Sequence, residues 1–356
     1  MNIGVVGCGA VTSLYYAPAL ELLENEGLLR VTTLFDPDPA AMARIGGTFP
    51  GACLAGELRE LLEREVGLVI VASPPRYHAE QTILALRSGR SVLCEKPLAT
   101  TAADGQAMIE AAVEAGQVLA VGMVRRFLPS TWTIRNLLAR GVLGELRAVH
   151  CFEGGPFEWP VRSQSYFDRS SSGGGVFLDI GIHVLDLLTW WFGPPSAVDY
   201  QDDAMGGVEA NCRIHLSYEG FGAEIQLSRD WARPNRYLLQ GSRSWLSWTV
   251  NDGDRFQMGS HDSEYVSEIR LHEVLMEGGV PAAGAPASNY HQGFVEQIRS
   301  VIRAMGGEDT PIVSGKQALE NVRLVEHCYQ NRALLAMPWL SEQERHNARK
   351  LSGSAA

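Results

Sequence analysis

A lysine follows one of the short apolar segments in the first third of the chain. Lys96 belongs to the tripeptide Glu95-Lys96-Pro97, directly after residues 91–94. If that segment is a parallel strand, Lys96 lies at the carboxyl edge of a sheet, where open α/β sheets bind ligands. Its ammonium group can donate to a substrate hydroxyl and orient the carbon that gives up hydride, while Glu95 can hold the lysine or a cofactor amide. Glu-Lys-Pro alone is typical of a solvated turn, so its position after the strand supports this interpretation.

A carboxylate and an imidazole four residues apart form the second candidate for chemistry. Asp179 and His183 follow a run of glycines, residues 173–175. On a helix, side chains at this spacing share one face and can touch. A carboxylate beside an imidazole sets its tautomer and raises its basicity, as a general base near neutral pH requires. The spacing fits equally well a helix N-terminus with an acidic residue and a buried structural histidine.

A glycine-rich turn directly follows the first apolar segment, residues 2–6. Gly7 permits a tight turn, and Gly9 lets the backbone approach a pyrophosphate at the N-terminus of a helix opened by Ala10 and Val11. The third glycine of the usual fingerprint is absent, and a proline interrupts the helix that follows. Glycine-rich turns also close many strand–helix units without a ligand, but the position at the first strand favours a dinucleotide.

Two further strand ends carry polar groups. Asp36 closes the second strand, where a carboxylate binds the adenosine ribose and repels a 2′-phosphate, so NAD is favoured over NADP; nearby Arg44 leaves that preference open. Asp36 also fits a simple Asp-Pro turn. Ser73 and Pro74 follow the strand predicted at residues 68–72 and His78 opens the next helix, so all three are candidates for cofactor contact. For His78, helix capping or packing is nearly as good an interpretation.

The elements that must position these groups alternate in the first 124 residues. Strands are predicted at residues 2–6, 29–35, 68–72, 91–94 and 119–123, with helices at 40–45, 56–64, 77–88 and 101–115. Short aliphatic strands separated by helices predict a parallel sheet covered on both faces, a doubly wound α/β domain.

The rhythm changes after residue 125, where a second, α+β domain is predicted. It has helices at residues 131–140, 176–191, 290–305 and 315–335, a strand at 146–152 and successive strands from 197 to 250. Such a run predicts a mostly antiparallel open sheet with one covered face. The expected domains are therefore residues 1–124 and 125–340, followed by a polar tail at 341–356 that frays.

Composition excludes several classes of protein. The chain has 356 residues, 46% of them apolar, and a net charge of −11 without a basic stripe, which argues against nucleic-acid binding. The six cysteines lie far apart without a metal-ligand spacing, so reduced thiols and no metal site are expected. No apolar run is long enough to span a membrane and the N-terminus lacks a signal-peptide pattern, which predicts a cytoplasmic protein.

Several motifs together resemble the glucose-fructose oxidoreductase / inositol dehydrogenase / MocA family. They are GCGAV, SPPRYHAE, GRSVLCEKPLA, VRRFLP and GGGVFLDIGIHVLD, in the family's order over the first half of the chain. The resemblance implies a Rossmann domain joined to a mostly antiparallel sheet that often serves as a dimer face, hence a homodimer or homotetramer. It also implies Lys96 as catalytic lysine, His183 as acid/base with Asp179, and, more weakly, Arg126 and Tyr166 as substrate contacts.

The sequence thus predicts an NAD(P)-dependent dehydrogenase that oxidises a secondary alcohol of a sugar, sugar derivative or cyclitol. Two alternatives stay open at this point. An NAD-dependent glycoside hydrolase uses the same family pattern but recycles its bound cofactor. A non-catalytic NAD-binding protein is the other alternative, and the presence of Lys96, Asp179 and His183 together argues against it. No residue rule identifies the sugar.

Overall fold

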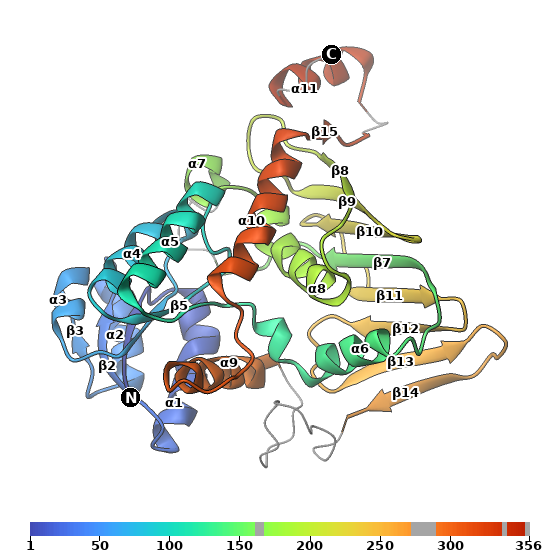
Figure 1. Cartoon of the computed structure of the whole chain (residues 1–356). Helices are drawn as coiled ribbons and strands as arrows, with labels where there is room; N and C mark the ends of the chain where they lie inside the picture. Colours follow the sequence, from blue (N-terminus) through green and yellow to red (C-terminus); the bar gives the residue numbers. More distant parts are fainter. Residues whose placement is uncertain (161–166, 272–289, 337–339, 353–356) are drawn as a thin grey trace. The chain divides into compact units, whose positions relative to one another are not determined.

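The computed structural model describes residues 1–160, 167–271, 290–336 and 340–352 (Figure 1). Contacts divide the chain into two compact units. Residues 1–127 and 273–322 form the first unit and residues 128–272 and 323–356 the second, in each case as far as they are described. The boundaries expected from sequence keep residues 125–340 together, whereas the contacts group the helix at Tyr290–Met305 with the first unit.

The first unit contains a six-stranded, wholly parallel sheet with the strand order β3-β2-β1-β4-β5-β6. This confirms the predicted doubly wound fold. β4 and β5 are buried along their whole length, as expected for central strands covered on both faces. The short β3 was not expected. The strands are β1 (Asn2–Val6), β2 (Arg30–Phe35), β3 (Cys53–Leu54), β4 (Leu68–Val71), β5 (Ser91–Cys94) and β6 (Leu119–Val121).

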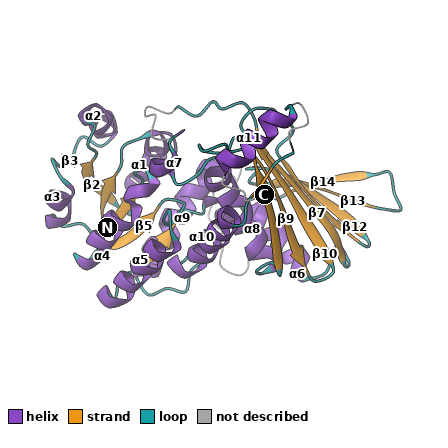
Figure 2. Cartoon of the chain, turned by 90° about the horizontal axis from the view of Figure 1, so that it is seen from above, coloured by secondary structure: helices purple, strands orange, loops and turns teal. Residues whose placement is uncertain are grey.

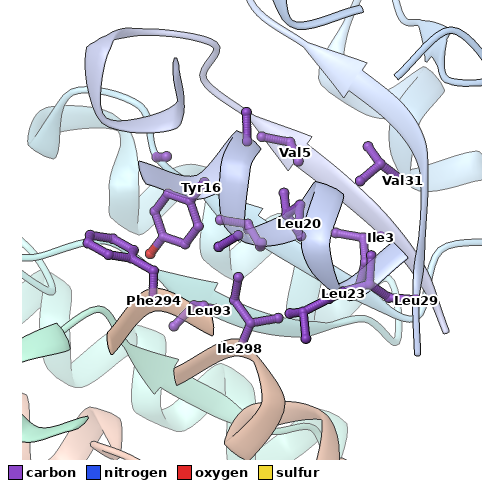
Figure 3. Packing of buried hydrophobic residues seen from close by; sticks show 14 of the residues in the cluster. Ile3, Val5, Tyr16, Leu20, Leu23, Leu29, Val31, Leu93, Phe294 and Ile298 are labelled. Atoms are coloured by element: carbon purple, nitrogen blue, oxygen red, sulfur yellow. The ribbon is translucent and has the colours of Figure 1, made fainter. Parts of the chain in front are cut away.

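Helices cover both faces of this sheet. On one face, Ile3, Leu93 and other strand residues pack against Leu20 of α1 and Ile298 of α9 (Figure 3). The other face receives α3, α4 and α5, with Gly4 leaving room for Leu61 of α3. The helices are α1 (Ala17–Asn25), α2 (Pro39–Thr48), α3 (Leu58–Glu63), α4 (His78–Arg87), α5 (Ala102–Ala115) and α9 (Tyr290–Met305), with short helices η2 (Pro75–Tyr77) and η3 (Val124–Phe127).

The helix after the glycine-rich turn does not break at its proline. Residues 10–25 are helical throughout, because a π-helical segment, η1 (Thr12–Tyr16), precedes α1. Pro18 has no N–H to donate to the preceding turn, and a wider π-turn is one way in which a helix accommodates such a gap. The expected interruption is therefore a change of helix type.

The second unit is built on a nine-stranded sheet of order β14-β13-β12-β11-β7-β10-β9-β8-β15. Only β7 with β10 and β8 with β15 pair in parallel, so the sheet is mostly antiparallel, as predicted. β13 and β14 extend it beyond the expected end at residue 250. The strands are β7 (Leu146–Gly154), β8 (Ala197–Asp202), β9 (Asn211–Tyr218), β10 (Phe221–Ser228), β11 (Arg236–Gly241), β12 (Ser244–Thr249), β13 (Arg255–Ser260), β14 (Val266–Arg270) and β15 (Ala333–Leu334).

The helices α6 and α8 lie on one side of this sheet (Figure 2). Burial alternates along β9, in agreement with a sheet that has one covered face. The tail expected to fray contains α11 instead, whose Ala348 is buried. The helical elements are α6 (Pro129–Ala139), α7 (Arg169–Ser172), η5 (Phe177–Gly181), α8 (Ile182–Phe192), α10 (Gly315–Gln330), which begins in the first unit, and α11 (Glu342–Ser352).

Within the described part of the chain, no helix is both long and apolar enough to cross a membrane.

Candidate functional site

The glycine-rich turn after β1 has one glycine held by protein and one that faces open space. Gly7 has a φ of 95°, and a Cβ there would lie 2.6 Å from the backbone of Ala72 and Ser73. Gly9 has no atom within 4 Å of the position that its Cβ would take. The peptide at Gly9 therefore has room for a ligand, and Ala10 and Val11 follow it as the first helical residues.

Asp36, at the end of β2, is fixed by two backbone N–H groups. Its Oδ2 accepts from Cys8 N at 2.7 Å and its Oδ1 from Asp38 N at 2.8 Å. Each carboxylate oxygen has a second lone pair, so further donors such as ribose hydroxyls can still bind. Arg44 donates from Nη2 to Cys8 O at 3.5 Å, which places a guanidinium group beside the same turn. The two side chains that bear on cofactor choice are thus neighbours.

His78 joins the exit of β4 to the exit of β5. Its ring nitrogens lie 2.8 Å from Pro97 O and 2.8 Å from Ser73 O, and the side chain is fully buried. Burial, with the positive charge of Lys96, lowers the pKa of His78, so the imidazole stays neutral. Each ring nitrogen thus faces a backbone carbonyl, and a neutral ring donates its single N–H to one of the two. The cofactor contact expected from the sequence stays a prediction. Pro74 precedes the short helix η2 in the strand exit that His78 holds.

Glu95 is buried beside Lys96 and has a partner for each oxygen. Tyr16 of η1 donates its hydroxyl to Oε1 at 2.7 Å, and the backbone N–H of Lys96 lies 3.1 Å from Oε2. Burial and this carboxylate raise the pKa of Tyr16, so the hydroxyl remains a donor. A Cβ at Gly122 would lie 2.7 Å from Oε1, so glycine is required there to admit the carboxylate. The peptide bond between Lys96 and Pro97 is cis.

Arg126 lies in η3, which follows β6, and is 7% exposed. It thus follows the carboxyl end of a strand of the parallel sheet, and the substrate contact that the family resemblance implies stays a prediction. Tyr166, the other expected substrate contact, lies outside the described residues.

In the second unit, Asp179 is ion-paired with a side chain that the sequence did not suggest. Arg229, just after β10, donates through Nη2 to Asp179 Oδ2. The guanidinium also lies over the ring of Phe157, with 4.9 Å between its carbon and the ring centroid. Asp179 is in the π-helical segment η5 and His183 in the first turn of α8, where it is 8% exposed. The predicted contact between Asp179 and His183 stays a prediction.

The glycines before η5 are packed against protein. A Cβ at Gly175 would lie 2.0 Å from Glu209 O, and one at Gly174 would lie 2.1 Å from the hydroxyl oxygen of Tyr329. The Glu209 side chain is 1% exposed, and its Oε1 accepts from Gly175 N at 2.9 Å and Phe177 N at 3.1 Å. Burial raises the pKa of Glu209. Nothing in its sequence context, a Gly-Gly-Val-Glu turn, indicates this role.

Sequence reasoning thus found the residues at the strand ends but missed their supports. In the first unit the structure brings the exits of β1, β4 and β5 together through Gly7 and His78. The end of β2 is linked to the same loops, because Asp36 Oδ2 accepts a hydrogen bond from Cys8 N. Lys96 belongs to this unit, whereas Asp179 and His183 belong to the other. Among the residues that the structure describes, no cluster of three or more histidine, cysteine or acidic side chains could hold a metal ion. The supporting residues that were missed are Tyr16, Glu209, Arg229 and Tyr329.

The parallel sheet and its glycine-rich turn define a dinucleotide-binding oxidoreductase domain. Residues 1–123 match the oxidoreductase family with an NAD-binding Rossmann fold, and residues 131–247 match the GFO/IDH/MocA C-terminal domain. The chain therefore belongs to the GFO/IDH/MocA family of oxidoreductases, as the motifs predicted.

Curated relatives include proteins that match over nearly the whole chain. An uncharacterized oxidoreductase of Streptococcus pneumoniae is 32% identical over 368 residues, covering 93% of this chain and 96% of the relative. The dTDP-3,4-didehydro-2,6-dideoxy-alpha-D-glucose 3-reductase of Saccharopolyspora spinosa is 28% identical over 93% of this chain and 97% of its own length. The scyllo-inositol 2-dehydrogenase (NADP(+)) of Bacillus subtilis is 27% identical over 75% of this chain and 68% of its own length.

Solved structures share the fold. Levoglucosan dehydrogenase in complex with NADH and levoglucosan has a TM-score of 0.79 at 18% identity, covering 93% of this chain and 96% of that one. A 3-ketoreductase from Actinomadura kijaniata in complex with NADP and TDP-benzene has a TM-score of 0.79 at 23% identity, covering 95% and 99%. At these identities the likeness concerns the fold alone.

Proposed function

We propose that the protein is an NAD(P)-dependent dehydrogenase that acts on a secondary alcohol of a sugar, sugar derivative or cyclitol. The observation that carries the proposal is Lys96, whose backbone is fixed at the carboxyl edge of the Rossmann sheet. It lies in a loop that His78 joins to the exit of β4. Family relatives are named as a scyllo-inositol dehydrogenase and a reductase of a keto sugar, which supports the same substrate class for this chain.

The chain's residues fit a dinucleotide. The open space at Gly9 admits a pyrophosphate against the backbone, and the helix that begins at Ala10 presents N–H groups to it. Asp36 has lone pairs for the adenosine ribose, and Ser73 and Pro74 line the neighbouring strand exit. When bound, the nicotinamide supplies the acceptor or donor of hydride.

The polar side chains then divide the work on the substrate hydroxyl. His183 removes its proton as general base, and Lys96 donates a hydrogen bond to the same oxygen and stabilises its developing negative charge. Asp179, held by Arg229, orients the imidazole. Glu95 holds the Lys96 backbone, and Arg126 and Tyr166 contact the remaining hydroxyls. This mechanism requires Lys96 and His183 to meet at one substrate, which a crystal structure with cofactor and sugar would test.

We further propose that NAD is preferred over NADP. Asp36 sits where a 2′-phosphate would be repelled, and its carboxylate is held in place by Cys8 N and Asp38 N. His78, whose two ring nitrogens face carbonyl oxygens, joins the two strand exits that would receive the cofactor.

A substrate screen tests the proposal. Polyols, aldoses, cyclitols and amino sugars are incubated with NAD or NADP, and the absorbance of the reduced cofactor is followed. We expect net reduction with at least one of these classes. A glycoside hydrolase would instead cleave glycosides without net use of added cofactor. Binding of NAD without turnover of any of them would contradict the proposal.

We also propose that the protein is cytoplasmic.

We further propose that it forms a homodimer or homotetramer through the face of the large sheet opposite α8. Leu238 of β11 lies in a cavity on the sheet, with His150 and Phe152 of β7 also lining it. A partner sheet would cover these side chains. Light scattering that shows a monomer at micromolar concentration would contradict the assembly.

A further inference from the structure

The helix that carries Asp179 and His183 begins without a capping side chain of its own. Val176 stands at the N-cap and makes no side-chain hydrogen bond to the first turn. The first N–H groups of any helix have no partner within the helix, and leaving them buried and unpaired is costly. Something outside the helix must therefore accept these hydrogen bonds.

Glu209 supplies both a side-chain and a backbone acceptor. Its Oε1 accepts from Gly175 N and Phe177 N, while its carbonyl oxygen accepts from Val176 N at 3.0 Å. Tyr329 of α10 donates its hydroxyl to the same Oε1 at 2.7 Å, which fixes the carboxyl group from the far side. Three successive N–H groups are thus satisfied by one residue that lies about thirty positions later in the chain.

The same loop also holds the partner of Asp179. Ala210 O accepts from Arg229 N at 2.8 Å, and the Arg229 guanidinium is paired with Asp179. Asp203 in turn accepts from the N–H groups of Ala210 and Asn211, both at 2.9 Å. The helix backbone and the Asp179 carboxylate are therefore located by adjacent residues of one braced loop.

We propose that Glu209, fixed by Tyr329, is a positioning residue of the reaction that sets the place and direction of the helix bearing Asp179 and His183. The inference rests on the proposed dehydrogenase function. Glu209 touches neither substrate nor cofactor in this role, so it acts on the reaction only through His183 and Asp179.

An oxygen acceptor at this place matters more than a negative charge. Glu209 Oε2 has no hydrogen-bond partner among the described residues, so all three donors converge on the other oxygen. The charged surroundings oppose ionisation, because burial and the nearby Asp202 raise the pKa of Glu209. Glu209 and Tyr329 of α10 have further titratable or charged side chains around them. These are Asp202 and Tyr200 of β8, Cys212 of β9, Arg169 of α7 and Arg332.

The chemistry of these contacts gives a rescue test. In Glu209→Gln an amide oxygen still accepts from the three donors, whereas in Glu209→Ala there is no side-chain acceptor. Tyr329→Phe removes one donor and leaves both helix N–H bonds. Tyr218→Phe is the matched control, because the hydroxyl of Tyr218, at the end of β9, is buried and has no partner among the described residues.

We would measure kcat, the Kd of NADH, the isotope effect with deuterated NADH, and hydrogen exchange of the peptide covering residues 174–184. In Glu209→Ala we expect kcat to fall by about 10–100-fold, because a displacement of about 1 Å at the reacting groups has effects of this size. The isotope effect and the exchange of the peptide should rise, while the Kd of NADH should stay within about twofold. Glu209→Gln should restore kcat to within about threefold of wild type. The kcat of Tyr329→Phe should lie between those of Glu209→Ala and wild type, and the kcat of Tyr218→Phe should equal that of wild type.

Faster exchange in Glu209→Ala with unchanged kcat and isotope effect would overturn the positioning role and leave the proposed function intact. If Glu209→Ala does not fold, a Glu209→Gln variant as impaired as Asp179→Asn would overturn it as well. Wild-type protein that oxidises no sugar or cyclitol would overturn the proposed function, and the positioning role with it.

Discussion

Two glycine-rich turns occur in this chain, and the structure uses them in opposite ways. Each leads into a π-helical segment and then an α-helix, η1 with α1 in the first unit and η5 with α8 in the second. At Gly9 the space where a Cβ would stand is open, whereas at Gly175 it is filled by Glu209 O at 2.0 Å. Glycine therefore leaves open space beside one turn and admits the protein's own backbone at the other.

A glycine-rich pattern in the sequence indicates that some group comes close to the backbone. It does not indicate whether that group is a ligand or another part of the protein. In the first turn Gly7 is needed for its φ of 95° and its contact with the β4 exit, and only Gly9 is left for a cofactor. In the second turn both Gly174 and Gly175 are needed for packing. The helix that carries Asp179 and His183 donates its first N–H groups to Glu209, a buried acid that the motif does not contain.

The largest expected effect tests whether residues of the two units that contain these turns serve one reaction. Lys96→Ala and His183→Ala should each lower kcat by about 10²–10⁴-fold, the usual contribution of a general acid or base. Asp179→Asn should lower kcat by less than His183→Ala does, because the imidazole of His183 remains in place. The Kd of NADH and the melting temperature should hardly change, and Lys316→Ala at an exposed lysine serves as control. A loss of kcat in only one of the two variants would contradict a shared reaction of Lys96 and His183.

The next effect distinguishes the two turns by stability. Gly175→Ala should lower the free energy of unfolding by about 1–3 kcal/mol, since the methyl group would meet backbone that cannot move aside cheaply. Gly9→Ala should change it by less than about 0.5 kcal/mol. Its effect should appear instead as weaker NADH binding, about tenfold or 1.4 kcal/mol. Denaturant unfolding and fluorescence titration measure the two quantities, and equal destabilisation in both variants would contradict the comparison.

The preference for NAD over NADP concerns Asp36, whose carboxylate accepts from Cys8 N in the first turn. The difference in affinity expected here is smaller than the effects above. NAD should bind at least about tenfold more tightly than NADP, which corresponds to about 1.4 kcal/mol. Asp36→Ser should reduce this difference, because Arg44 beside Cys8 O would then face a 2′-phosphate without a competing carboxylate. Equal affinities of the wild type, measured by titration of tryptophan fluorescence, would refute the role given to Asp36.

The smallest expected effect is the change of the free energy of unfolding with pH. Its sign should differ between His78 in the first unit and Glu209 in the second. The pKa of buried His78 is lowered, so the unfolded state binds more protons and His78 costs stability as pH falls below about 6.5. The pKa of Glu209 is raised, so the folded state binds more protons and Glu209 costs stability as pH rises above about 4.5. Relative to His78→Gln, the wild type should become less stable in acid. Relative to Glu209→Gln it should become more stable in acid, and slopes of the same sign in chemical denaturation would contradict this contrast.

Local sequence determined the elements and their class. Alternation of apolar strands and helices located β1 and β5 to the residue and the helix at Tyr290–Met305 as well. The order of motifs identified the family from GCGAV, EKP and GGGVFLDIGIH. These features depend on side-chain periodicity and on short backbone turns, which neighbouring residues control. Where the pattern was weak, as in the two-residue β3 and in β13 and β14, the prediction failed.

Only the tertiary structure decided which buried polar groups support the chemical ones. The ring nitrogens of His78 lie 2.8 Å from Ser73 O and from Pro97 O, because two strand exits meet around this side chain. Glu209 accepts from Gly175 N, 34 residues before it and just ahead of η5, and Tyr16 holds a carboxylate 79 residues away. Such bonds form because a buried donor or acceptor must find a partner, and that partner is set by packing. Sequence spacing carries no trace of that choice.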